Sequence, residues 1–68
     1  MADVTERQMT ALKQLGSRFA YYPDIYITTL RRLEDKGLVE MQWNRGLREW
    51  RRTTTGDAVV ADRLLEEP

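Results

Sequence analysis

The segment from Thr28 to Val39 constrains the fold most, because it joins a helical pattern to a stop signal and then to a strand. Ile27, directly before this segment, is spaced three apart from Leu30 and Leu33 within it, and the three share one side of a helix. Gly37 suits the left-handed residue that ends a helix, and Lys36 places a cation at the negative end of the helix dipole. We predict a helix over residues 24–36 that buries leucines and presents threonine and arginine.

Residues 1–16 are predicted to form a first helix. Thr5 with Gln8 fits a capping box, and Asp3 with Glu6 fits one equally well. An apolar stripe of Met9, Leu12 and Leu15 precedes Gly16, a natural helix stop. Residues 17–23 are too few for a second full helix, so we expect one helical turn over 17–21 and then a turn at Pro23.

Two strand-like segments follow Gly37. Residues 38–43 and 48–53 flank the sequence Asn44-Arg45-Gly46-Leu47, in which asparagine and glycine tolerate positive φ, so a β-hairpin is predicted. Trp43 and Trp50 are expected on the hairpin face that covers the helices. Thr53 or Thr54 is then expected to cap a last helix. Its apolar side is predicted to be Val60, Ala61, Leu64 and Leu65.

The composition removes several classes of function. The 68 residues allow one domain, 1–68, and they include no cysteine and no histidine. Disulfides, thiolate metal sites and the commonest general base are therefore excluded, so we expect neither an enzyme nor a bound metal or cofactor. No apolar run reaches 18 residues, and Asp3 and Glu6 do not suit a signal peptide, so a soluble cytoplasmic protein without membrane contact is expected.

Charge is distributed unevenly along a chain whose net charge is zero. Residues 31–52 contain seven bases and four acids, a net +3, whereas residues 57–68 contain one base and four acids, a net −3. A negatively charged partner is therefore expected to approach the middle of the chain. Arginine outnumbers lysine nine to two, which favours planar recognition of phosphates and bases over diffuse attraction.

Two motifs together resemble a known family. Residues 30–40, LRRLEDKGLVE, are similar to the end of the recognition helix in the PadR and MarR families of transcription regulators. Residues 50–56, WRRTTTG, resemble the start of the helix that follows the wing in these proteins. The resemblance covers about residues 25–60 and implies an α+β winged helix-turn-helix with three helices, a two-stranded hairpin wing and a C-terminal helix. The short interval between Leu15 and Leu30 implies a truncated second helix, as in compact winged-helix proteins of phages, plasmids and archaea.

The resemblance implies a transcriptional regulator that occupies an operator in double-stranded DNA, as a homodimer and without an evident small-molecule effector. The recognition helix would enter the major groove, and the hairpin would contact phosphates or the minor groove. The expected DNA-binding residues are Asp24, Ile25, Thr28, Thr29, Arg31, Arg32, Asn44, Arg45, Arg48 and Arg51.

Other interpretations stay open. Arg31 and Arg32 can pair with Asp35 one helical turn away, and the hairpin arginines can pair with Glu40 or Glu49 across the strands. A winged-helix module for protein–protein interaction is the alternative function. The neutral charge and the acidic last helix permit it, and an apolar side of that helix would support self-association or docking.

Overall fold

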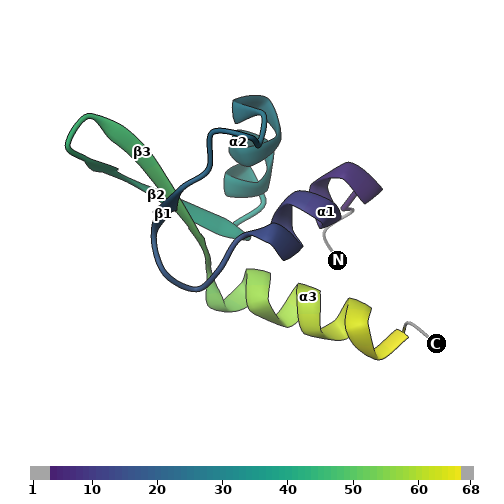
Figure 1. Ribbon diagram of the computed structural model, residues 1–68. Coiled ribbons are helices and arrows are strands. Elements are labelled where there is room, and N and C mark those ends of the chain that lie inside the picture. Colours follow the sequence, from purple (N-terminus) through teal and green to yellow (C-terminus); the bar gives the residue numbers. More distant parts are fainter. Residues whose placement is uncertain (1–3, 67–68) are drawn as a thin grey trace.

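The computed structural model describes residues 4–66, which form three helices and a three-stranded antiparallel sheet (Figure 1). The elements follow in the order α1 (Glu6–Gln14), β1 (Ala20–Tyr21), α2 (Ile27–Asp35), β2 (Val39–Asn44), β3 (Leu47–Arg52) and α3 (Thr54–Glu66). The strand order is β1-β3-β2, and the β2–β3 hairpin extends away from the helices. The α+β class is confirmed, although the chain has one helix fewer and one strand more than predicted.

Helix α1 begins at the predicted capping box. The Thr5 hydroxyl accepts from the Gln8 N–H at 3.1 Å, and the Gln8 side chain accepts from the Thr5 N–H at 3.2 Å. The alternative box with Asp3 involves a residue outside the described range. The helix ends at Gln14 because Leu15 is already extended, so Gly16 lies beyond the helix end.

The segment between α1 and α2 differs from the prediction. In place of a helical turn, the chain extends into β1, where Ala20 lies opposite Trp50 and Tyr21 opposite Glu49. This pairing covers the edge of β3 and bonds its backbone groups, a stabilisation that a lone helical turn does not offer. A turn at residues 23–25 then leads directly into α2, so no helix lies between α1 and α2, where a truncated second helix was expected.

Helix α2 ends as predicted, although it begins three residues late. The Leu38 N–H donates to the Leu33 oxygen at 3.0 Å, and the Gly37 N–H donates to the Glu34 oxygen at 2.9 Å. With φ +76° at Gly37, this is a Schellman motif. It joins the helix to β2 and buries both Leu33 and Leu38.

The hairpin is confirmed, with two corrections. Arg45 and Gly46 form the two-residue turn with φ of +53° and +80°, so the residues with positive φ are these and not Asn44, which lies in β2. Trp43 and Trp50 lie on one face, because their cross-strand partners are Arg48 and Met41. Only Trp50 is buried, since Trp43 lies nearer the turn, beyond the reach of the helices.

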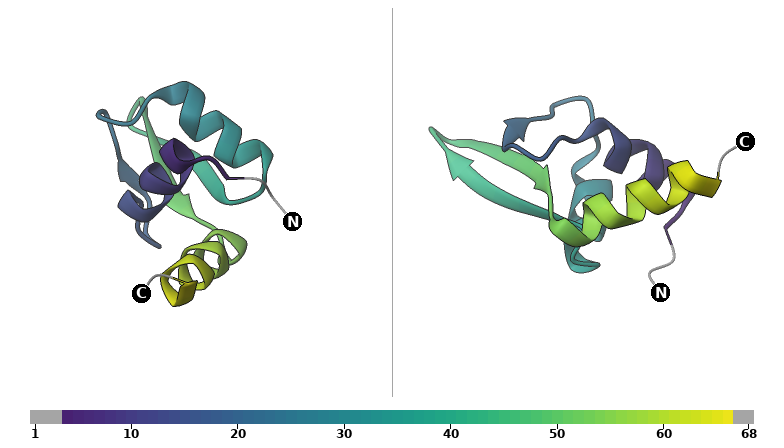
Figure 2. Two further views of the ribbon diagram at one scale, coloured as in Figure 1. Left: turned by 90° about the vertical axis from the view of Figure 1, so that its right-hand side faces the viewer. Right: turned by 90° about the horizontal axis from the view of Figure 1, so that it is seen from below.

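The core lies between the helices and the hairpin base. Its largest fully buried side chains are Leu12, Leu15, Leu30, Leu33 and Leu38. Helices α2 and α3 both contact α1 and lie on opposite sides of it (Figure 2). The predicted apolar side of α3 is correct for Val60, whereas Ala61, Leu64 and Leu65 are exposed, because the second half of α3 extends past the body.

Thr53 connects three elements at the base of the hairpin. Its hydroxyl accepts from the Gly56 N–H at 3.0 Å, which caps α3, and donates to the Gly37 oxygen at 2.7 Å. Its own N–H donates to the Leu38 oxygen at 3.1 Å. Thr53, and not Thr54, is therefore the cap, and it holds the start of α3 against the end of α2.

Candidate nucleic-acid interface

The exposed face of α2 carries four residues spaced by three and four positions: Thr28, Arg31, Arg32 and Asp35. Leu30 and Leu33 on the opposite face are buried. Ile27 was predicted in the core but is 39% exposed, because it lies at the edge of α2 that faces the hairpin. The predicted threonine–arginine face is therefore present, and α3 lies on the far side of the molecule from it.

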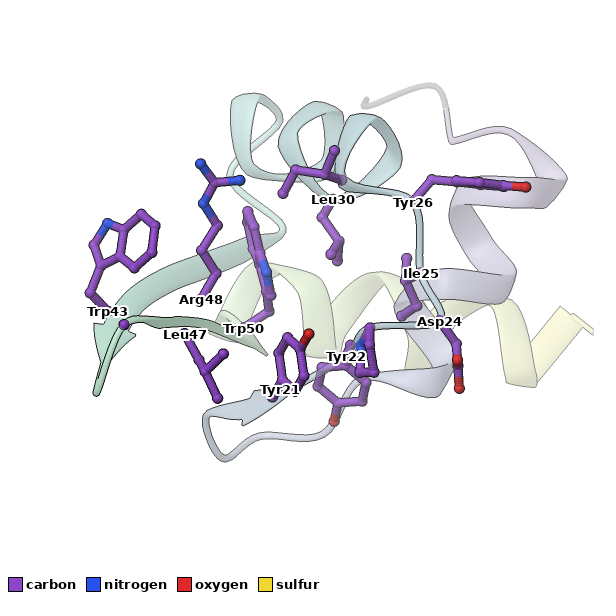
Figure 3. A pocket seen from close by; sticks show the side chains of 13 residues that line it. Tyr21, Tyr22, Asp24, Ile25, Tyr26, Leu30, Trp43, Leu47, Arg48 and Trp50 are labelled. Carbon is purple, nitrogen blue, oxygen red and sulfur yellow. The ribbon is translucent and has the colours of Figure 1, made fainter.

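The hairpin contributes Arg48 beside this face. Arg48 and Trp50 project from the same side of β3 toward α2 (Figure 3). The Arg48 guanidinium lies over the Trp43 ring, 5.0 Å from its centroid, a distance that fits a cation–π contact. Arg48 and Arg31 line one depression of about 230 Å³ between α2 and the hairpin. The structure thus brings one predicted arginine from the helix together with one from the hairpin.

Asn44 and Arg51 do not join this surface, because they lie on the reverse face of the hairpin. Arg51 is ion-paired with Glu40, and its guanidinium lies 4.2 Å from the centroid of the Phe19 ring. The cross-strand pairing that stood as the alternative interpretation is therefore correct for Arg51.

Asn44 donates to the Glu49 carboxylate at 3.2 Å, and Gln42 donates to it at 2.8 Å. The hydrogen bond from Gln42, followed by that from Asn44, holds the pKa of Glu49 below its ordinary value. Glu49 therefore keeps a negative charge on the reverse face of the hairpin, which leaves the face with Arg48 as the cationic one.

Three other predicted residues occupy positions that do not suit contact with bases. Asp24 and Ile25 precede α2 in the turn, and Ile25 packs against the core. Thr29 is only 8% exposed, because it faces α1 and not solvent. Arg45 is exposed at the hairpin turn, as predicted.

The exposed arginines around α2 are free of intramolecular ion pairs. Within residues 4–66, Arg7, Arg31, Arg32 and Arg45 make no salt bridge, so the proposed pairing with Asp35 does not form. Arg63 on α3, in contrast, is paired with Glu6. An approaching anion would therefore meet guanidinium groups that need not release a carboxylate first.

Three residues near this surface were not found from the sequence. Arg7 of α1 lines a depression together with Arg32, Tyr26 is 74% exposed at the start of α2, and Trp43 is 61% exposed beside Arg48. Arg7 carried no local signal, because its position depends on how α1 packs against α2. The alternating pattern along β2 did indicate that Trp43 shares a face with Met41, though it did not indicate that Trp43 is exposed.

Among residues 4–66, no three carboxylates lie close enough together to hold a metal ion. No helix in the same range has the length and apolar character needed to cross a membrane. Comparisons of the chain with protein-family models, curated proteins and solved structures returned no match.

Proposed function

We propose that the protein is a compact winged-helix regulator that binds double-stranded DNA and acts by occupying an operator. The observation that carries this proposal is the exposed α2 face with Arg31 and Arg32 unpaired, flanked by Arg48 on the hairpin and Arg7 on α1. The order of helices and strands also fits a winged helix-turn-helix, with the turn at residues 23–25 in place of the motif's first helix. The proposed activity is binding and not catalysis.

In this proposal α2 lies in the major groove. Its exposed face offers the Thr28 methyl group to a thymine methyl, and an arginine to the O6 and N7 atoms of guanine. Arg48 and Arg45, on the inner face and at the turn of the hairpin, then contact the adjacent backbone. Asp35 lies at the C-terminal end of the same face and would come near phosphates only if the whole length of α2 lay in the groove. Because a carboxylate near phosphates is unfavourable, we favour an orientation in which only the first half of α2 enters the major groove.

Affinity for duplex DNA is expected to fall steeply with salt. If Arg7, Arg32, Arg45 and Arg48 each neutralise one phosphate, the log–log slope is about −3.6, because each contact contributes about −0.9. Arg45→Gln should reduce the magnitude of the slope by about 1 and weaken binding to all DNA sequences equally. Titrations can follow tryptophan fluorescence, since Trp43 is exposed at the interface while Trp50 is buried. A slope near zero would contradict the proposal.

The proposal includes a homodimer formed through the end of α3. Leu64 and Leu65 are 56% and 85% exposed there, on the side of the molecule away from α2. Two copies joined at this end would leave both α2 faces free for two half-sites. Sedimentation equilibrium is expected to show a dimer that Leu65→Lys converts to a monomer, whereas Ala61→Ser should preserve it. A monomeric mass at all concentrations would remove this part of the proposal.

A protein-interaction module is the second candidate, and one observation favours it. Among the residues whose exposure is described, five of the seven exposed large apolar ones line a single groove of about 550 Å³ between the hairpin and the start of α2 (Figure 3). These residues are Tyr21, Tyr26, Ile27, Trp43 and Leu47. Clustering of this kind is common at sites for protein partners. If the affinity for duplex DNA does not depend on salt concentration while α2 remains folded, this candidate becomes the better one.

A further inference from the structure

The first turn of α2 has backbone N–H groups without partners. Thr5 caps α1 and Thr53 caps α3, but the residue before α2 is Tyr26, whose side chain makes no capping hydrogen bond. Within residues 4–66 no oxygen accepts from the N–H of Ile27, Thr28 or Thr29. These groups carry the positive end of the helix dipole, so they can bind an anion.

The side chain of Thr29 supplies an independent indication of a ligand. Thr29 is more than nine-tenths buried, and its hydroxyl has no hydrogen-bond partner among the described residues. The hydroxyl oxygen is not among the fully buried unpartnered atoms of the described residues, so a bound group or water can reach it and satisfy it. Thr29 lines a depression of about 430 Å³ between the start of α2 and α1, which we call the Thr29 site.

The charge of the Thr29 site is positive. Arg7 from α1 and Arg32 from α2 both line it, together with the Thr28 side chain. None of the described residues that line it is acidic. Neither arginine has an intramolecular ion pair within residues 4–66. Hydroxyl and backbone donors beside two guanidinium groups match the oxygens and the charge of a phosphate.

We infer that the Thr29 site binds a phosphate group. Its oxygens would accept hydrogen bonds from the first-turn N–H groups and from the Thr29 hydroxyl, while Arg7 and Arg32 balance its charge. This inference rests on the proposed function for the source of the phosphate, which is a backbone phosphodiester of the duplex on the α1 side of α2. Arg32 then fixes the position of the DNA, and Arg31, on the hairpin side, is left to read bases.

The test is a titration of the whole protein with inorganic phosphate, and separately with duplex DNA, both at constant ionic strength. The amide resonances of Ile27, Thr28 and Thr29 are followed by NMR. They are expected to shift with both ligands. Thr29→Val removes the hydroxyl while keeping the shape of the side chain. It should weaken the binding of both ligands about tenfold. It should leave the unfolding temperature equal or higher, because no internal hydrogen bond is lost. Thr54→Val, on the far side of the molecule, is the matched control and should change neither affinity.

The outcomes separate the phosphate site from the DNA proposal. Shifts with inorganic phosphate but no binding of any duplex would support the site and remove the proposed function. Weaker phosphate binding in Thr29→Val with unchanged duplex binding would overturn the assignment of the phosphate to the DNA backbone. Duplex binding without shifts at the three amides, or phosphate affinity unchanged by Thr29→Val, would overturn the Thr29 site and leave the DNA proposal standing.

Discussion

Gly56→Ala is expected to destabilise the fold by about 3 kcal/mol, a severe loss for a domain of this size. A Cβ at position 56 would lie 2.0 Å from the Leu38 carbonyl oxygen and 3.0 Å from its carbon. Both are backbone atoms of the segment that leaves α2, so they cannot move as the end of a side chain can. Helix α3 cannot withdraw either, because Thr53 bonds its first turn to Gly37 and Leu38.

Urea unfolding followed by circular dichroism measures this effect, and the unfolding temperature should fall by about 10–20 °C. Gly16→Ala is the matched control. A Cβ at position 16 meets nothing closer than 4.0 Å, and Gly16 does not have a positive φ, so its stability should change by less than about 0.5 kcal/mol. Equal stabilities of the two variants would show that α3 does not approach Leu38 this closely.

The double variant Arg31→Gln/Arg32→Gln is expected to lose about 100-fold in affinity for a preferred duplex, because Arg31 would lose a base contact that contributes about 1–3 kcal/mol and Arg32 a charge-assisted phosphate contact. Both side chains are exposed and lack ion pairs within residues 4–66, so glutamine leaves no carboxylate without its partner. Stability should therefore be unchanged, and the loss can be assigned to the interface. Anisotropy of a labelled duplex gives the affinity, and thermal unfolding checks the fold.

Arg51→Gln provides the control for that experiment. It removes one positive charge, where the double variant removes two, from the same basic region of the sequence, but Arg51 lies on the reverse hairpin face against Glu40 and Phe19. Its affinity for DNA should remain within about twofold of the unchanged protein, because exposed ion pairs contribute little and this one lies away from α2. If Arg51→Gln weakens binding as much as the double variant does, the duplex contacts the opposite face of the hairpin.

The two tests address different parts of the interpretation. The Gly56 result depends only on the fold, and it stands whether or not the protein binds DNA. The arginine result depends on the proposed function, since a protein-interaction module would keep its fold in both arginine variants and bind no duplex. If Gly56→Ala destabilises the fold as expected but the arginine experiment shows no duplex binding through α2, the groove that Trp43 and Tyr26 line becomes the better candidate for the functional site.

Local features of the fold were predictable from the sequence. The capping box of Thr5 and Gln8 and the helix end at Gly37 each depend on residues within a few positions of one another. The hairpin is also local, since its two-residue turn connects adjacent strands. The exposed face of α2 follows from helical spacing alone. In each case the partners of the relevant hydrogen bonds or contacts are neighbours in sequence.

Features that depend on distant contacts were missed. Strand β1 forms because β3, about thirty positions later, offers it an edge, and no pattern in residues 17–23 indicates this. The division of the hairpin arginines into two faces required the register of β2 against β3. Thr29 has the same residue type as Thr28, yet one is buried against α1 and the other is exposed.

The sequence by itself therefore determined part of the local structure: the capped start of α1, the end of α2, the reversal of the hairpin, and which side of α2 is polar. Only the tertiary structure decided which arginines remain unpaired around that side, and that Thr29, Arg7 and Arg32 enclose one depression. The physical reason is that backbone conformation responds to neighbouring residues, whereas charge pairing and burial depend on which surfaces come together when the chain folds.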